Sequence, residues 1–149
     1  MKRLFFLIAL AFSWMLSQGQ MQSMKEDGWK IKWNKKTILE ASSENEKANT
    51  RKLRKADLQK NYTLDIYYKE GNAKNQAEWK RSFLFFDDKD NQLLDKPEAG
   101  HVRLTSALLR KLFKNSKKIK IYTLSIPTDP DVAARVRVRR VHLATLELL

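Results

Sequence analysis

The chain contains no cysteine, and glycine, proline and histidine are scarce, with 4, 3 and 2 copies in 149 residues. Without cysteine there can be no disulfide bond, no thiol catalysis and no cysteine-ligated zinc. A lipid anchor attached to cysteine is excluded for the same reason. With so few glycines, the sequence has no glycine-rich phosphate-binding loop and no glycine-flanked nucleophile turn. Several common nucleotide-binding, hydrolytic and redox chemistries are therefore not expected.

The residues that could bind a metal are poorly arranged. His101 and His142 are far apart and stand in neither metal-ligand nor triad spacing. The stretch "DDKDNQ", residues 87–92, offers alternating carboxylates, but it lacks the central glycine and the distant glutamate of an EF-hand calcium loop. Such a stretch is more typical of a hairpin turn. We therefore expect no metal, no cofactor and no catalytic residue, and we predict that the protein is not an enzyme.

The first 19 residues have the layout of a secretory signal peptide. Two cations, Lys2 and Arg3, precede an apolar run over Leu4–Leu16, and small and polar residues follow. The run is short against the roughly 20 residues that a membrane-spanning helix needs, and no later stretch is apolar enough to span. We expect residues 1–19 to be removed and residues 20–149 to form a single domain in the periplasm or outside the cell.

Positive charge dominates the composition. Without Lys2 and Arg3, 28 basic residues stand against 17 acidic ones, which gives the predicted mature chain a net charge of +11. Such an excess keeps a protein soluble and attracts it to anions, whether nucleic acid, acidic glycan or a phosphorylated lipid surface. Net charge alone names no partner, and many exported proteins are basic without a dedicated anion site.

Alternation of apolar and polar residues predicts strands through most of the mature chain. In "WKIKW", Trp29, Ile31 and Trp33 share one face, and we expect them to pack in the core rather than form a platform for sugars. Helical spacing over Ser106–Lys114, behind a capping Thr105, predicts one short helix. We therefore predict an all-β, two-layer sandwich, Ig-like or similar, with about seven strands and one crossing helix. The expected strands are residues 29–33, 37–40, 50–53, 62–68, 79–86, 117–127 and 135–148.

A weak internal repeat supports two packed sheets. Apolar residues of the first half recur at similar spacing in the second, and "LDIY", residues 64–67, recurs as "IKIY", residues 119–122. In each copy a strand end leads through a crossing segment into the "I-Y" strand, which predicts two related halves facing each other across one core. The matching apolar residues are Leu53, Ala56 and Leu58 in the first copy and Leu104, Ala107 and Leu109 in the second.

The last two strands are expected to pair as a long antiparallel hairpin whose register follows from their apolar residues. In this register Ile126 lies opposite Val136, and Ile121 lies opposite Val141. Both strands then change their apolar face at one level, near Thr123 and Arg139, which predicts a hairpin that bends or crosses between the two layers. Bulges at Arg139 or Arg140 would produce the same change locally. The same register opposes Leu124 with Val138, Ile119 with Leu143, and Lys120 with His142.

The hairpin divides the basic residues of "RVRVRRV", residues 135–141, between two faces. Arg135, Arg137 and Arg139 form a row on one face, where three guanidinium groups could bridge phosphate, sulfate or carboxylate groups. The alternative is that their stems cover apolar neighbours while their charged ends stay in water. A second basic face is predicted on the other side, and it comprises Lys118, Lys120, Arg140 and His142.

The stretch "PTDPDVAARVRVRRVHLATLEL", residues 127–148, resembles a part of small exported bacterial proteins of unassigned function. The resemblance implies a cell-envelope or secreted setting and supplies no catalytic residue. Two classes of function stay open. The first is a non-catalytic binding module whose arginine row docks an acidic glycan, lipopolysaccharide phosphate or nucleic acid. The second is a structural or assembly protein that binds another protein of the envelope.

Overall fold

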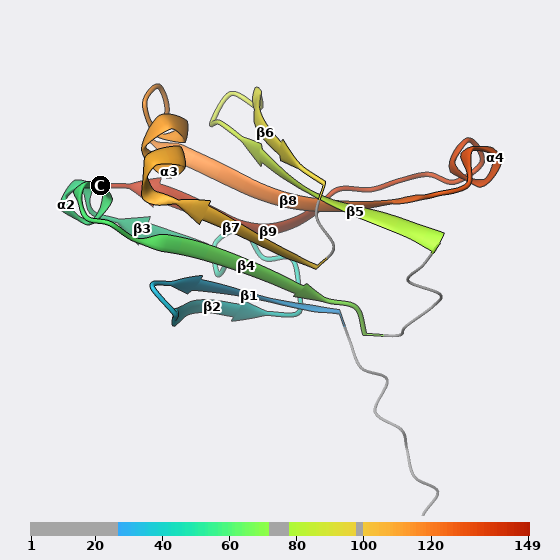
Figure 1. Ribbon diagram of the computed structural model, residues 1–149, viewed down its shortest axis with the longest axis horizontal. Coiled ribbons are helices and arrows are strands. Elements are labelled where there is room, and N and C mark those ends of the chain that lie inside the picture. The colour runs from blue at the N-terminus through green and yellow to red at the C-terminus, as the bar shows by residue number, and fades with distance from the viewer. Residues whose placement is uncertain (1–26, 72–77, 98–99) are drawn as a thin grey trace, which may run out of the picture.

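The computed structural model describes residues 27–71, 78–97 and 100–149. These residues form two stacked β-sheets with three short helices at their ends (Figure 1). The predicted all-β, two-layer sandwich is confirmed, with nine strands among the described residues in place of about seven. The predicted signal peptide lies outside the described residues. None of the helices described is long and apolar enough to cross a bilayer.

Sheet A has four antiparallel strands in the order β2-β1-β4-β7. Its first hairpin has a two-residue turn at Asn34 and Lys35, whose φ angles of 47° and 70° suit a primed turn. The Asn34 side chain also accepts a hydrogen bond from the Thr63 N–H at 2.9 Å, which ties this turn to the next strand. The bounds are Gly28–Trp33 for β1, Lys36–Ala41 for β2, Thr63–Lys69 for β4 and His101–Thr105 for β7.

Sheet B has five strands in the order β3-β9-β8-β5-β6, and its β3 pairs with β9 in parallel. Strand β5 lies inside this sheet between β8 and β6, a position that suits the apolar residues on both faces of its second half. The stretch "DDKDNQ" forms the turn between β5 and β6, as expected. The bounds are Thr50–Leu53 for β3, Trp79–Phe86 for β5, Gln92–Lys96 for β6, Lys118–Pro127 for β8 and Val141–Leu148 for β9.

The predicted helix is α3, Ser106–Leu112, which ends two residues earlier than expected. Its cap is Thr105, whose hydroxyl accepts a hydrogen bond from the Leu108 N–H at 3.4 Å. Helices α2, Lys55–Gln59, and α4, Pro130–Ala133, were not predicted. Each has little more than one turn, which is too short to show a helical period in the sequence.

The internal repeat matches the path of the chain over two segments. The first, β3-α2-β4, passes from sheet B to sheet A, and the second, β7-α3-β8, passes from sheet A to sheet B. The two crossing helices meet at one end of the sandwich, where Arg110 donates a hydrogen bond to the Leu58 carbonyl at 2.9 Å. The match ends there, because β4 continues into the opposite sheet whereas β8 continues into its own.

The space between the sheets is filled by apolar side chains that alternate along each strand. Trp29 is buried, and its indole N–H donates to the Leu143 carbonyl of the opposite sheet at 2.8 Å. Trp33 stacks on Tyr62 with ring centres 4.0 Å apart. The expectation of core packing is confirmed for Trp29, whereas Trp33 is partly buried and packs against the core.

The predicted register of the terminal hairpin is wrong. Ile121 lies opposite Ala144 rather than Val141, and the pairing shifts by one at a bulge between Ile121 and Tyr122. The bulge lets Leu143 and Ala144 both face the core, an arrangement that simple alternation does not foresee. In addition, residues 135–140 belong to no strand, so the proposed pairing of Ile126 with Val136 does not exist.

The predicted crossing of this hairpin between layers is also wrong, because β8 stays in sheet B along its whole length. The change of apolar face near Thr123 has another cause. From this level on, the inner side of β8 meets the polar Arg81 side chain instead of aliphatic ones, so Thr123 and Ser125 occupy it while Leu124 and Ile126 lie on the outer side.

Candidate functional site

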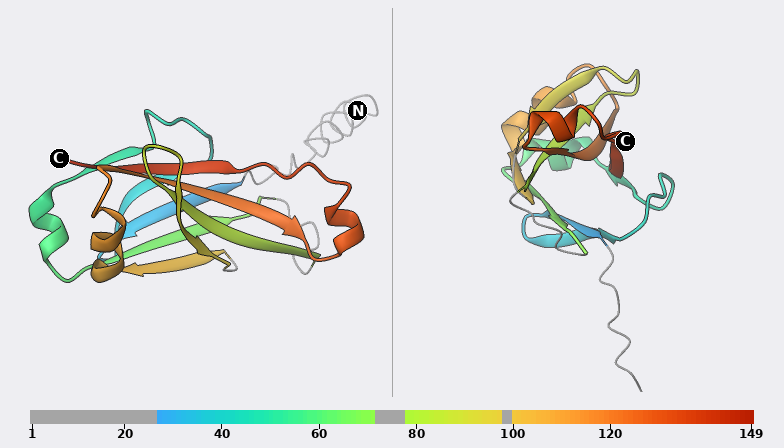
Figure 2. Two further views of the ribbon diagram at one scale, coloured as in Figure 1. Left: turned by 90° about the horizontal axis from the view of Figure 1, so that it is seen from above. Right: turned by 90° about the vertical axis from the view of Figure 1, so that its right-hand side faces the viewer.

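One end of sheet B projects past sheet A. Strands β5 and β8 continue beyond the ends of β1, β4 and β7, and they carry α4 at their far end (Figures 1 and 2). The chain then returns beside β8 through residues 135–140 before β9 begins. We call residues 78–80 and 124–140 the tip. The predicted arginine row lies in this projecting part of the molecule.

The arginine row does not lie on a strand face as expected. Arg135 follows α4, and Arg137 and Arg139 belong to the irregular return segment. Arg137 and Arg139 line a hollow of about 200 Å³ that opens between the tip and the end of sheet A. Apolar and polar groups from both sheets complete its lining, including Trp79, Arg81 and Tyr68.

The return segment is held at its C-terminal half. Glu44 accepts hydrogen bonds from the Arg139 guanidinium and, at 2.8 Å, from the His142 N–H. The Arg140 guanidinium lies over the rings of Phe86 and Tyr122, 4.7 and 5.3 Å from their centres. These contacts hold the backbone beside the arginine row in place, although residues 135–140 belong to no strand.

Arg135 and Arg137 differ from these neighbours. Both are exposed, and the part of the chain that the structure describes provides no ionic or hydrogen-bonding partner for either guanidinium. Arg139, by contrast, is neutralised by Glu44. Two uncompensated arginines therefore stand at the beginning of a segment whose end is fixed.

The second basic face exists on the outer side of sheet B, but acids neutralise part of it. Lys118 pairs with Glu147 at 3.5 Å, and Lys120 pairs with Asp90 at 3.0 Å. The predicted pairing of Lys120 with His142 is wrong, because the bulge places Thr145 opposite Lys120 and Tyr122 opposite His142. His142 is buried, and its Nε2 lies 3.0 Å from the Thr145 hydroxyl.

A polar cluster closes the sandwich at the base of the tip. Arg81 of β5 lies over the Tyr68 ring, forms an ion pair with Glu70 and donates to the Thr123 hydroxyl at 3.0 Å. The Tyr68 hydroxyl in turn donates to Asp27 at 2.9 Å. Burial, aided by the Asp27 carboxylate, raises the pKa of Tyr68 to about 12. The charge of Arg81 is already compensated here, so the cluster is chiefly structural.

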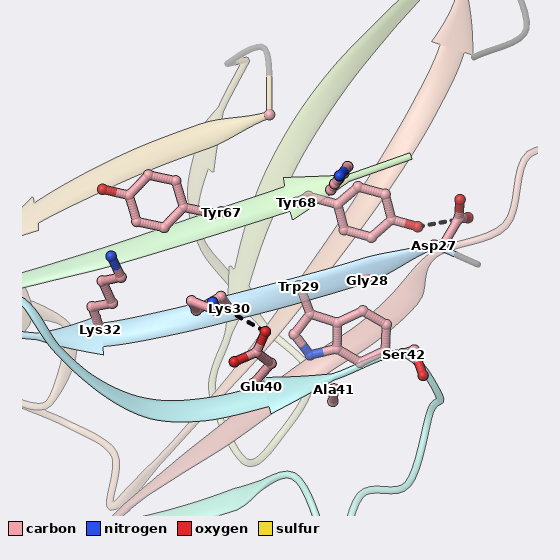
Figure 3. A pocket seen from close by; sticks show the side chains of 12 residues that line it. Asp27, Gly28, Trp29, Lys30, Lys32, Glu40, Ala41, Ser42, Tyr67 and Tyr68 are labelled. Atoms are coloured by element: carbon pink, nitrogen blue, oxygen red, sulfur yellow. Dashed lines mark hydrogen bonds and ion pairs between the residues drawn. The ribbon is translucent and has the colours of Figure 1, made fainter. Parts of the chain in front are cut away.

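The outer face of sheet A carries a second hollow, of about 690 Å³ (Figure 3). Lys30, Lys32 and Tyr67 project from neighbouring strands into it, and Gly28 leaves room at its end. Lys30 is paired with Glu40 at 3.0 Å. The Lys32 ammonium lies over one face of the Tyr67 ring and His101 stacks on the ring, so little of it is left for a sugar.

This face was missed at the sequence level, although its residues were visible. Lys30 and Lys32 alternate with the core residues of "WKIKW", and Tyr67 alternates with those of "YTLDIYY". Only the pairing of β1 with β4 brings the two sets together, since it places Lys30 opposite Tyr67. Pairing the outward residues of the two expected strands could have revealed it.

A buried carboxylate lies on the same outer face. Asp65 is 2% exposed and accepts hydrogen bonds from the Arg103 Nε at 2.6 Å and from His101 at 3.0 Å. Burial alone raises the pKa of Asp65, but its hydrogen bonds with Arg103 and His101 outweigh burial and hold that pKa below its usual value. Ion pairs of this kind stiffen a sheet surface and need no ligand.

Known proteins offer no relative. No family model, no curated protein and no solved structure matches this chain. Over the described ranges, no three histidine or acidic side chains gather as a metal site would require. Function is therefore inferred from the geometry of the tip and of the two hollows.

Proposed function

We propose that the protein is a non-catalytic binding module and that its arginine row, Arg135, Arg137 and Arg139, holds an anionic ligand. The observation that carries this proposal is the contrast in charge compensation. Each of the other described arginines contacts an acid, a backbone carbonyl or an aromatic ring, whereas Arg135 and Arg137 are exposed and uncompensated on a projecting tip.

The surroundings of the row favour binding over mere solubility. Glu44 anchors one end of the return segment, and at the other end the Asp129 carboxylate caps α4 by accepting from the Asp131 N–H at 2.8 Å. Less conformational entropy is then lost when the arginines engage a ligand. Guanidinium groups match phosphate, sulfate and carboxylate groups with two parallel hydrogen bonds, which a lysine cannot offer.

The proposed ligand class is an acidic glycan, lipopolysaccharide phosphate or nucleic acid. These share closely spaced anionic groups, and the hollow beside Arg137 is large enough for one such group. An exported location, in the periplasm or outside, is part of the proposal and depends on the signal-like residues 1–19. Envelope proteins remain the second class of partner, through the same tip.

Retention on an anionic matrix such as heparin or immobilised polyphosphate tests the proposal. The double variant Arg135→Ala, Arg137→Ala should elute at clearly lower salt, with a shallower dependence of affinity on salt, because two ion contacts are lost. The matched control is Lys52→Ala, Lys55→Ala, which removes the same charge from exposed positions in β3 and α2.

Arg135→Lys, Arg137→Lys separates geometry from charge, since it keeps the charge and removes the planar donors. We expect intermediate retention for this variant. Equal losses in the arginine variant and in the matched lysine variant would mean that retention reports net charge alone, and the proposed site would be wrong.

A further inference from the structure

The tip concentrates exposed apolar side chains. Four of the seven large apolar residues that are markedly exposed in the described chain lie there: Trp79, Ile126, Val132 and Val138, with exposed fractions of 36–43%. Single exposed apolar residues are common on soluble proteins, but a group of them on one projection is not. The group shares the tip with the arginine row.

These side chains do not form one flat face. Trp79 lies opposite Pro127, and Ile126 lies opposite Lys80, so alternation directs Trp79 and Ile126 to opposite sides of the β5-β8 pair. Val132 lies on α4, and Val138 on the return segment. A rigid protein partner would cover one side, whereas these residues surround the end of the projection. Such a distribution suits insertion into a fluid apolar phase.

Cations accompany the apolar residues of the tip. Lys80, Arg135, Arg137 and Arg140 provide four positive charges, beside an Arg139 that Glu44 compensates. The acids of the tip are Glu78, Asp129 and Asp131, and the Asp129 carboxylate is occupied in capping α4. The long arginine and lysine stems allow their charged ends to reach a headgroup layer while apolar neighbours lie deeper.

We infer that the tip inserts into the headgroup region of an anionic lipid bilayer, with lipid phosphates as the ligand of the arginine row. This inference rests on the proposed function and names its partner. A soluble polyanion would engage the arginines but would leave Trp79, Ile126 and Val132 in water. Binding to a bilayer is favoured by both groups of residues, because cations are attracted to anionic lipid and apolar side chains become buried at the interface. Tryptophan is a common residue at this boundary.

Vesicle sedimentation with the predicted mature chain, beginning at Gln20, tests the inference. Vesicles of phosphatidylcholine containing phosphatidylglycerol should bind the protein, and binding should weaken with salt, whereas pure phosphatidylcholine vesicles should bind poorly. Brominated lipids should quench tryptophan fluorescence on binding. Trp79 is 39% exposed, whereas Trp29 is buried and Trp33 packs against the core, so the quenching reports the tip.

The double variant Ile126→Ser, Val132→Ser distinguishes this inference from the proposed function. It should bind anionic vesicles about tenfold more weakly or worse, because two apolar side chains no longer enter the interface. Its retention on heparin should be unchanged. Leu93→Ser, at an exposed apolar position of β6 outside the tip, is the matched control and should bind both as the unaltered protein does.

Each alternative occupant gives a different result. Retention on heparin without vesicle binding would overturn the lipid inference and leave the proposed function standing. If neither the arginine variant nor the apolar variant changes vesicle binding, both the lipid inference and the proposed function would be overturned. Self-association in the absence of lipid that Ile126→Ser, Val132→Ser abolishes would show that a second copy covers the tip, and the lipid inference would be wrong.

Discussion

The Arg81 guanidinium, on β5, lies 3.9 Å from the centre of the Tyr68 ring, on β4, and so connects the two sheets where sheet A ends. Glu70 and the Thr123 hydroxyl each accept a hydrogen bond from it. At this level the sandwich is closed by polar contacts instead of the aliphatic packing found further inside. The cluster thereby supports the base of the tip, which projects from the same strands.

Arg81→Ala should lower the free energy of unfolding by about 3 kcal/mol, because it leaves Glu70 unpaired and removes a cation from an aromatic ring. Chemical denaturation measures the change. Lys80→Ala, at the exposed neighbouring position, is the control and should change stability by less than about 0.5 kcal/mol. Equal effects in the two variants would contradict a structural role for the cluster.

Tyr68 should make stability sensitive to alkali. Its pKa is about 12 in the folded protein, chiefly because of burial, against 10.0 for an unperturbed tyrosine. The neutral hydroxyl is therefore favoured by folding, and its contribution is complete below pH 10 and is lost as the pH rises towards 12. Tyr68→Phe should lower the free energy of unfolding by about 1 kcal/mol at neutral pH, because the hydrogen bond to Asp27 is lost. Above pH 10 the free energy of unfolding of this variant should decline less steeply than that of the unaltered protein. Urea denaturation across this range compares the two proteins.

Asp65 should contribute to acid sensitivity. Its pKa is lowered because the hydrogen bonds with Arg103 and His101 outweigh burial, so its contribution is complete above the usual carboxyl pKa and is lost as the pH falls through the lowered value. Asp65→Asn should cost about 1–2 kcal/mol at pH 7 and flatten the decline in stability below pH 4. Thermal unfolding at several pH values measures this decline. If stability falls below pH 4 as steeply in the variant as in the unaltered protein, Asp65 is not the source of the acid sensitivity.

His142 should make the fold less stable in mild acid. Burial lowers the pKa of His142 below 6.5, so the unfolded chain takes up a proton that the folded protein does not. Stability should therefore begin to fall as the pH drops through 6.5 and continue to fall until the folded group also titrates. His142→Phe should remove this part of the pH dependence, which urea denaturation between pH 7 and pH 5 measures. If the slope of stability against pH is the same in this variant, the effect belongs to another group.

Glu44 should lower the affinity of the arginine row for anions. Glu44→Gln frees the Arg139 guanidinium from its ion pair, so we expect elution from heparin at higher salt and a dependence on salt steeper by about one ion. Glu147→Gln makes the same change of charge beside Lys118, away from the tip, and should shift elution less. If both variants shift elution equally, Arg139 does not contact the matrix.

The fold class follows from patterns that are local in the sequence. The alternation in "WKIKW" and "YTLDIYY" identifies β1 and β4 and their core residues, and the spacing behind Thr105 identifies α3. These patterns need only a few neighbouring residues, because side-chain direction alternates along any strand. The same reasoning predicted the inward position of Trp29.

The register of β8 with β9 could not be obtained in this way. Pairing apolar with apolar residues placed any bulge at Arg139 or Arg140, whereas the bulge lies at Leu143 and the short helix α4 separates the two strands. The free energy of such a bulge depends on how Leu143 and Ala144 pack against sheet A, which is a contact far away in the sequence. The arginine row lies between α4 and the start of β9, and therefore outside the ladder.

The sequence by itself determined a basic, cysteine-free, two-layer β-sandwich and the clustering of arginines at residues 135–140. Only the tertiary structure decided which cations are compensated, because Glu44 lies far from Arg139 along the chain and meets it through the packing of the loop before β3. It also decided that Trp79 and Val132 share one projection with those arginines. Charge compensation and exposure depend on distances between remote segments, and folding sets those distances.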